Sequence, residues 1–297
     1  MKVSVIVATF GRDELLNRAL ASLAKQTHRD LEIVVVDDNE EASFSLRVDE
    51  ILDGFRVDHP DLPVVCVKNG CRLGSARARN AGIAVATGEY ITFLDDDDEY
   101  LPEKVEAQVR FMAEGRLDYS LTDLALYHED GTPAERRVRS YIQKHDTESL
   151  LTYHLLHHLT GTDTLMFTAE YLRSINGFPP HDMGDEFYLM QRAIEKGGRF
   201  GYLPRCDVRA TEHREDGGLS SGPRKIEGEC QLYEHKKAYF DRLSGRSVRY
   251  IRMRHHAVLA FAYGRQKKVG RLLLHGVRAF LLSPVGCIGL LKQRLSR

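Results

Sequence analysis

The chain has 297 residues, of which 42% are hydrophobic and 29% are charged, and its formal net charge is −1. This length and composition are typical of a soluble globular protein, built as one large domain or as one domain with an appendage. The five cysteines are odd in number and form no CxxC pair, which argues against a disulfide framework and indicates reduced thiols in the cytosol. Met1 and Lys2 lead directly into strand-like sequence, so we expect no signal peptide.

The first 115 residues alternate between strand and helix patterns. Four β-branched runs that end in polar residues are typical of buried parallel strands, and the stretches between them predict helices. The last of these helices begins near Pro102, a favourable residue for a first turn. The alternation predicts right-handed βαβ units, with a parallel sheet covered on both faces. The expected strands are 2–10, 31–38, 63–69 and 90–96, and the expected helices are 13–26, 43–55, 75–86 and 103–115.

Polar side chains follow three of the expected strands at the points where the strands end. They are residues 9–12, the pair Asp37 and Asp38, and the run of four aspartates at 95–98. Ligands of parallel α/β sheets bind at the carboxyl ends of the strands, where these three clusters converge. The sequence therefore predicts a site at this edge of the sheet.

The four aspartates at 95–98 need a partner that cancels their mutual repulsion. Carboxylates in a D-x-D spacing at a strand end bind Mg²⁺ or Mn²⁺ and leave positions open for phosphate oxygens. The alternative is that Asp97 or Asp98 only caps the helix that begins near Pro102. A cap needs one aspartate rather than four, so a metal site is the better interpretation.

Other residues near the expected edge support a nucleotide ligand less specifically. The chain contains neither GxGxxG nor GxxxxGK[ST], so the usual glycine-rich phosphate loops are absent. Asp37 and Asp38 follow a hydrophobic strand, where an acid hydrogen-bonds a ribose or a base edge in dinucleotide-binding folds, although acids also occur there in ordinary turns. Arg77 and Arg79 either neutralise phosphate or are solvated helix arginines.

Residues 116–230 are less regular. The segment 118–131 predicts a strand and a hairpin turn, and 162–178 predicts a strand, a helix and a glycine stop. The segment 185–198 predicts a helix with Asp185 and Glu186 in its first turn and two glycines at its end.

The C-terminal segment is purely basic. Residues 242–297 contain 13 of the 42 Lys and Arg residues and no Asp or Glu, which leaves 29 basic against 43 acidic groups in the rest of the chain. Their helical periodicity, with no charge-free run long enough to span a bilayer, predicts helices that lie on an anionic membrane surface. The alternatives are a basic helical pair packed on the acidic body, or a homodimer contact. Nucleic acid is not an expected partner, because the segment lacks interleaved stacking aromatics.

Several motifs together resemble the family 2 glycosyltransferases of the GT-A fold. They are "VSVIVATFGR", "IVVVDD", "RLGSARARNAGIAVATGEYITFLDDDDEYLP" and "GDEFYLMQRA", and the resemblance runs from residue 2 to about 220. It implies a Rossmann-like αβα sandwich, α/β in class, with a mostly parallel central sheet and here a helical basic C-terminal extension. It also implies sugar transfer with inversion from a nucleoside diphosphate donor, with Mn²⁺ or Mg²⁺ as cofactor.

The resemblance assigns roles to individual residues. Asp95 and Asp97 match its D-x-D metal motif, and His213 lies where a late loop residue sometimes contacts metal or phosphate. Asp185 and Glu186 match its acid pair in reversed order, and the second acid, Glu186, is the expected catalytic base. The residues expected to bind the nucleotide sugar are Thr9, Phe10, Arg12, Asp37, Asp38, Arg79, Asp95 and Asp96, with Asp96 and Asp98 as helpers of the metal motif.

These observations predict an enzyme that adds one sugar, from a UDP-sugar, to a glycan or lipid-linked acceptor in cell-surface polysaccharide biosynthesis. The Gln-x-x-Arg-Trp motif of processive members is missing, and the chain has no tryptophan at all. We expect residues 1–115 to bind the donor, 116–230 to bind the acceptor, and 231–297 to form the amphipathic region, at the inner face of the cell membrane. The alternatives are a nucleotidyltransferase and a non-catalytic nucleotide-binding protein on a similar sheet.

Overall fold

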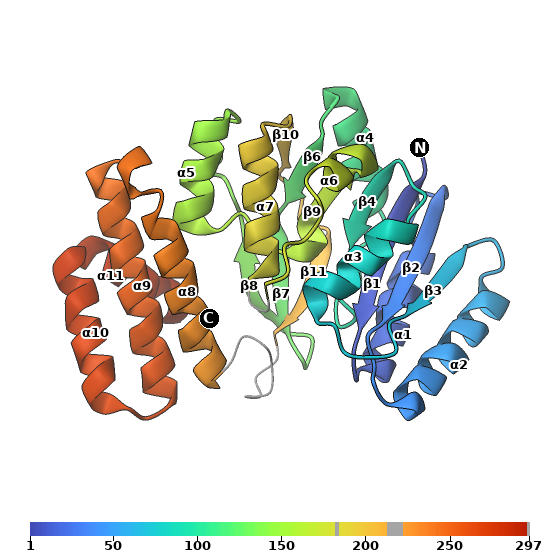
Figure 1. Cartoon of the computed structure of the whole chain (residues 1–297), viewed down its shortest axis with the longest axis horizontal. Helices are drawn as coiled ribbons and strands as arrows, with labels where there is room; N and C mark the ends of the chain where they lie inside the picture. The colour runs from blue at the N-terminus through green and yellow to red at the C-terminus, as the bar shows by residue number, and fades with distance from the viewer. Residues whose placement is uncertain (182–183, 213–221, 296–297) are drawn as a thin grey trace. The chain divides into compact units, whose positions relative to one another are not determined.

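The computed structural model describes residues 1–181, 184–212 and 222–295 (Figure 1). The chain forms two compact units. The first comprises Met1–Leu150 and Leu159–Glu212, and the second comprises Leu151–His158 and His213–Arg297.

The first unit is built on a central sheet, to which seven strands of the described residues belong. Their order is β10-β6-β9-β4-β1-β2-β3, and all neighbouring pairs are parallel except those that β9 makes with β4 and β6. The first four strands along the chain match the expected runs. The strands are β1 (Val3–Thr9), β2 (Leu31–Asp37), β3 (Val64–Lys68), β4 (Tyr90–Phe93), β6 (Tyr119–Thr122), β9 (Leu165–Thr168) and β10 (Phe200–Leu203).

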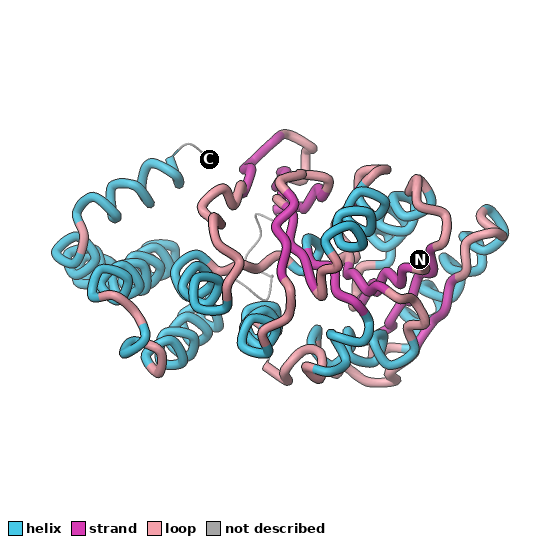
Figure 2. The backbone as a smooth tube through the Cα atoms, turned by 90° about the horizontal axis from the view of Figure 1, so that it is seen from above, coloured by secondary structure: helices cyan, strands magenta, loops and turns pink. Residues whose placement is uncertain are grey.

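Helices cover both faces of this sheet, which is why β1 and β2 are mostly apolar and buried along nearly their whole length, rather than alternating between buried and exposed residues. One face forms a core with α1 (Asp13–Ala24), α2 (Ala42–Asp58) and α4 (Lys104–Gly115). On the other face α3 (Ser75–Val85) packs so closely that a Cβ at Gly82 would lie 2.6 Å from Ile6. The helices α6 (Ala169–Ser174) and α7 (Asp185–Lys196) lie on the same side as α3 in Figure 1, and Figure 2 shows the strands between helices.

A smaller sheet begins directly after the aspartate run. Its order is β5-β11-β7-β8, formed by β5 (Glu99–Tyr100), β7 (Leu124–His128), β8 (Pro133–Arg137) and β11 (Val208–Glu212). The predicted single strand within 118–131 is therefore wrong, because β6 and β7 belong to different sheets. They separate at buried Asp123, whose Oδ1 accepts hydrogen bonds from the Arg139 amide (3.1 Å) and the Tyr202 hydroxyl (2.7 Å).

The second unit is helical. The helices α9 and α10 pack side by side around buried Met253, Ala257 and Ala279 (Figure 1). The helix α10 ends before Pro284, and Pro284 is the first residue of α11, as expected for a proline at a first turn. The remaining helical elements are α5 (Thr147–His157), η1 (Thr162–Thr164), α8 (Gly222–Lys237), η2 (Phe240–Arg242), α9 (Gly245–Arg265), α10 (Val269–Leu282) and α11 (Pro284–Leu295).

Candidate active site

Three strands of the central sheet end together at one edge. Thr9 at the end of β1 is in register with Asp37 at the end of β2, and Phe93 at the end of β4 pairs with Ile6 of β1. Because these strands are parallel, the polar residues that follow them gather at the same edge, as predicted. The four aspartates at 95–98 form the turn that follows β4 at this edge.

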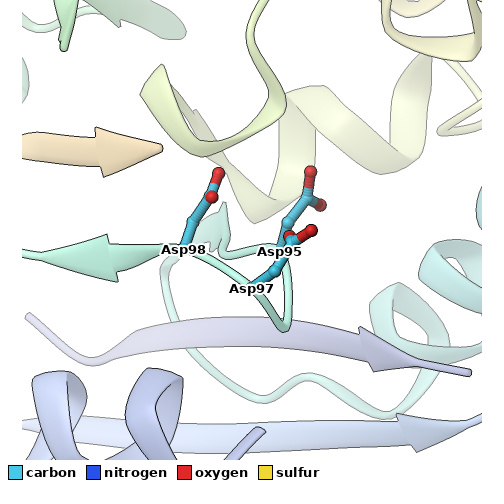
Figure 3. A group of neighbouring side chains, drawn as sticks. All are labelled: Asp95, Asp97 and Asp98. Carbon is cyan, nitrogen blue, oxygen red and sulfur yellow. The ribbon is translucent and has the colours of Figure 1, made fainter. Parts of the chain in front are cut away.

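Asp95, Asp97 and Asp98 bring their carboxylates together (Figure 3). One oxygen from each lies within 4.8 Å of the others, and Asp97 and Asp98 are buried while Asp95 is half-exposed. Three carboxylates are the hard oxygen ligands that Mg²⁺ and Mn²⁺ prefer, so this cluster fits the expected cation. Asp98 also accepts a hydrogen bond from the Thr211 amide (2.8 Å) at the end of β11.

Asp96 lies apart from this cluster and binds the first strand. It accepts hydrogen bonds from the Thr9 hydroxyl (2.8 Å) and from Arg12 (3.3 Å), whose guanidinium also pairs with Asp97. Burial and the neighbouring charge of Asp97 raise the pKa of Asp96 to about 6. Thr9 and Arg12 therefore hold the aspartate run against β1.

Asp163 is a buried acid that the sequence analysis missed. Its Oδ1 accepts a hydrogen bond from the Asp95 amide (2.7 Å), and its carboxyl group hydrogen-bonds that of Asp98. Burial, followed by the charge of Asp95, raises the pKa of Asp163 above its usual range. The signal was present as an acid just before the apolar run "TLMFT". Because β9 is antiparallel to β4, its beginning lies at the carboxyl end of β4.

Arg79 connects the aspartate run to the acid pair of α7. Its buried guanidinium donates to Asp95 Oδ1 (2.6 Å) and to Asp185 Oδ2 (2.8 Å), and Asp185 also accepts from the Ser75 hydroxyl (2.9 Å). The neighbouring Arg77 is exposed on α3. Of the two arginines in "GSARARNAG", only Arg79 thus belongs to the site edge.

Asp185 and Glu186 occupy the first turn of α7 with unequal surroundings. Burial opposes the charge of Asp185, but Arg79 and the hydrogen bonds from Glu186 and Ser75 outweigh it, so the pKa of Asp185 lies below its usual range. Glu186 is half-buried, and burial together with the charge of Asp185 raises the pKa of Glu186 above its usual range. Paired acids whose pKa values are pushed apart are typical of acid–base sites.

The two acids at the end of β2, Asp37 and Asp38, are both buried and differ in their hydrogen bonds. Asp38 accepts hydrogen bonds from Asn69 Nδ2 (2.8 Å) and from the amides of Leu73 and Gly74 (2.9 Å each), so it holds the loop that leads into α3. Asp37 Oδ1 accepts from Asn39, whereas its buried Oδ2 has no hydrogen-bond partner among the described residues.

Phe10 and His213 are the remaining residues that the sequence analysis assigned to the site. Phe10 is 41% exposed at the same edge, and its ring lies 4.3 Å from the Arg72 guanidinium carbon. His213 lies outside the described residues. The structure thus gathers Thr9, Arg12, Asp37, Asp95, Asp96 and Asp97 at one edge, with Arg79 linking that edge to Asp185 and its neighbour Glu186.

Comparison with known proteins decides the family. The sequence profile described as glycosyl transferase family 2 matches residues 4–171, more than half of the chain. The chain belongs to glycosyl transferase family 2. The family resemblance predicted from the motifs is therefore confirmed.

The curated relatives of this family member include named bacterial glycosyltransferases. It is 31% identical over 170 residues to the putative teichuronic acid biosynthesis glycosyltransferase TuaG of Bacillus subtilis, covering 57% of this chain and 62% of the relative. It is 29% identical over 121 residues to the Escherichia coli UDP-Glc:alpha-D-GlcNAc-diphosphoundecaprenol beta-1,3-glucosyltransferase WfaP, covering 41% and 45%. The matches span 20% to 62% of the length of these two and three further curated relatives, which are uncharacterized glycosyltransferases.

A solved structure confirms the fold of this family 2 member. The mannosyltransferase PcManGT from Pyrobaculum calidifontis, in complex with GDP-Man and Mn²⁺, superposes with a TM-score of 0.63 at 19% identity, covering 99% of this chain and 79% of that one. The predicted GT-A architecture with a helical C-terminal region is thus confirmed. Within the described residues, every helix is too short or too polar to cross a bilayer.

Proposed function

We propose that this family 2 member is an inverting, metal-dependent glycosyltransferase that moves a single sugar from a UDP-sugar to a glycan or lipid-linked acceptor in cell-surface polysaccharide biosynthesis. One observation carries the proposal. Arg79 ties Asp95 of the acidic cluster to Asp185 of the acid pair, with contacts of 2.6 and 2.8 Å. A cation site and an acid–base site joined by one buried side chain suit a reaction that needs both at once.

Asp95, Asp97 and Asp98 are the residues that would hold Mn²⁺ or Mg²⁺, since their carboxylates form a compact oxygen ligand set. His213 stays a candidate for a further ligand. When bound, the ion stabilises the negative charge that accumulates on the leaving diphosphate. The Mn²⁺ named with the mannosyltransferase structure supports a divalent ion here.

Glu186 is the proposed general base, and Asp185 orients the site through Arg79. Inversion by one displacement needs a group that takes the proton from the acceptor hydroxyl as it attacks. Glu186 suits this role because its pKa is raised toward the working pH, where a base transfers protons most effectively. Asp185 is committed to Arg79 and Ser75 and is less free to take a proton.

The residues after β1 and β2 are the proposed nucleotide site. Phe10 offers an exposed ring face for a base, and Asp37 has a buried oxygen that lacks a partner among the described residues. Thr9 and Arg12 would position the aspartate run beside the phosphates, while Asp38 fixes the adjoining loop. The name of the E. coli relative supports a UDP-sugar, whereas the mannosyltransferase structure holds GDP-Man.

We place the donor site in residues 1–115, the acceptor site in 116–230 and a membrane-facing region in 231–297, at the inner face of the cell membrane. The lipid-linked substrate in the name of the E. coli relative supports an acceptor of that class. The teichuronic acid relative supports a role in surface polysaccharide synthesis.

Donor binding and turnover test the proposal separately. A thermal-shift screen of UDP-, GDP-, dTDP- and CMP-nucleotides with Mn²⁺ or EDTA should show a Mn²⁺-dependent rise with one diphosphate, because a ligand of the folded state stabilises it. Glu186→Gln should keep this shift and lose turnover by at least about 100-fold, the contribution typical of a general base. Glu170→Gln, in the exposed first turn of α6, is the matched control and should change neither.

Unchanged turnover in Glu186→Gln would remove the assignment of the base. Transfer of a nucleotidyl group in place of a sugar would identify the chain as a nucleotidyltransferase. Binding of a nucleotide without any turnover would favour the non-catalytic alternative.

A further inference from the structure

The helix α10 exposes an apolar face that a water-soluble surface does not usually carry. Every residue of α10 is described, and the face that turns away from the buried Ala279 consists of Val269, Gly270, Leu273, Leu274, Val277, Phe280 and Leu281. The six large side chains are between 48% and 75% exposed. Scattered exposed apolar residues need no explanation, but a continuous row along one helix marks an interaction surface.

Positive charge borders this apolar row. The turn between α9 and α10, at the beginning of the row, exposes Arg265, Lys267 and Lys268. Near the start of the next helix, α11, Val285 is a further apolar side chain that is 83% exposed. Arg271 and Arg278 lie on the helix itself. Because an α-helix turns by about 100° per residue, these two arginines, seven residues apart, fall on the same flank of the apolar row. We call the apolar row with its basic border the α10 face.

We propose that the α10 face docks on the surface of an anionic lipid membrane, with α10 lying in the plane of the interface. Charge complementarity carries the choice of occupant, since residues 242–297 contain 13 basic residues and no acid. Apolar side chains on one face with Lys and Arg at its border are the pattern of helices that bind the boundary between headgroups and acyl chains. Long basic side chains at that border reach lipid phosphates while the apolar row enters the hydrocarbon.

A second copy of this chain fits the α10 face less well. A two-fold contact would set the same patch against itself, and the basic borders would then repel each other. The proposal deepens the proposed function, because a membrane-bound transferase meets a lipid-linked acceptor in two dimensions. It needs no catalysis, however, so its test is separable from that of the function.

The test is co-flotation of the full chain with vesicles, without donor or acceptor. Wild type should bind vesicles of phosphatidylcholine with about 30% phosphatidylglycerol, and binding to phosphatidylcholine alone should be much weaker and insensitive to salt. Leu273→Ser/Val277→Ser/Leu281→Ser should weaken binding to the anionic vesicles by about 100-fold, because three side chains no longer enter the hydrocarbon. Lys267→Gln/Lys268→Gln should weaken it by about 25-fold, and only where anionic lipid is present.

Matched controls separate the face from general surface hydrophobicity. Leu46→Ser/Val57→Ser removes two comparably exposed apolar side chains from α2 and should bind like wild type. Unchanged thermal melting of each variant shows that the fold is retained. The variant Lys267→Gln/Lys268→Gln keeps the apolar row of the α10 face and therefore tests the contribution of the basic border alone.

Three outcomes would overturn the proposal: no binding of wild type to anionic vesicles, equal binding by the apolar variant, or a dimer in solution that the apolar variant dissociates. Loss of turnover with intact vesicle binding would overturn the proposed function and leave the α10 face standing. Sugar transfer to a soluble acceptor by a chain that does not bind vesicles would support the proposed function and overturn the proposal for the α10 face.

Discussion

Replacing Arg79 by methionine should destabilise the first unit severely, because two acids depend on its guanidinium. Asp185 is buried, whereas Asp95 is 38% exposed and can recover water on losing its partner. Removing one partner of a buried ion pair typically costs about 3–5 kcal/mol, and a half-exposed pair contributes about 1 kcal/mol or less. Most of the loss therefore comes from Asp185. We expect Arg79→Met to lower the free energy of unfolding by about 3–4 kcal/mol.

Urea unfolding followed by circular dichroism measures this loss, and a double-mutant cycle assigns it. Arg79→Met/Asp185→Asn removes the unpaired buried charge, so it should be more stable than Arg79→Met alone by about 2 kcal/mol. Arg77→Met on the exposed side of the same helix is the control and should stay within about 0.5 kcal/mol of wild type. If Arg79→Met unfolded within about 1 kcal/mol of wild type while its donor KM rose sharply, Arg79 would serve the donor alone and the reasoning about the acids would be refuted.

Three further predictions address pH, the metal site and packing. Burial opposes the charge of Glu32, but the hydrogen bonds from Lys2, Ser4 and Thr87 outweigh it and lower the pKa of Glu32 from 4.5 to about 2. The stabilising contribution of Glu32 is therefore present above about pH 4.5 and is lost as the pH falls toward 2. Glu32→Gln should therefore flatten the fall of unfolding free energy in that window by about 1–2 kcal/mol in acid titrations of stability, less than the whole pKa shift would give, because Lys2 is partly exposed and its charge is screened. Asp163→Ala should weaken Mn²⁺ binding, measured by calorimetry, by about 10- to 100-fold, because it removes the acceptor of the Asp95 amide. Gly88→Ala should lower the melting temperature, since a Cβ there would lie 2.6 Å from the Ser4 backbone nitrogen.

Each of these has a control or a contrary result. A pH profile of stability that is identical in Glu32→Gln and wild type would contradict the lowered pKa. Asp163→Asn keeps an acceptor for the amide and should bind Mn²⁺ better than Asp163→Ala; equal affinities would show that the hydrogen bond to Asp95 does not matter. Gly245→Ala, where a Cβ meets nothing within 4 Å, should melt like wild type.

The donor-side fold was predictable because its information is local. The strands β1 to β4 are short apolar runs ended by polar residues, and parallel pairing brings Thr9, Asp37 and Asp95 to one edge without any knowledge of distant contacts. The second sheet was not predictable in this way. Its strands pair residues such as Arg209 and Ala125, far apart in sequence, and β8 carries the weakly apolar sequence "PAERR".

The residues of the candidate site were likewise predictable where the signal is local, and not where it depends on distant contacts. Residue type and spacing identified the aspartate run and the acid pair, but not which acids face one another. Asp96 bonds Thr9 and Arg12 rather than joining the cluster of its neighbours, because successive side chains of a turn point in different directions. Asp163 escaped notice because its role depends on the antiparallel placement of β9, which the pattern "TDTLMFT" does not reveal.

The placement of β9 between β4 and β6 has a consequence for the order in which the molecule assembles. The aspartate run is made early along the chain, yet the carboxylate that supports Asp95 arrives 68 residues later and only with a strand inserted between two others. Contacts of such sequence separation form slowly, because a long loop must close before they stabilise anything. A nascent or refolding chain thus contains all four aspartates well before their support is in place. We expect high-affinity Mn²⁺ binding to appear late in refolding, which makes the metal a reporter of completed strand insertion.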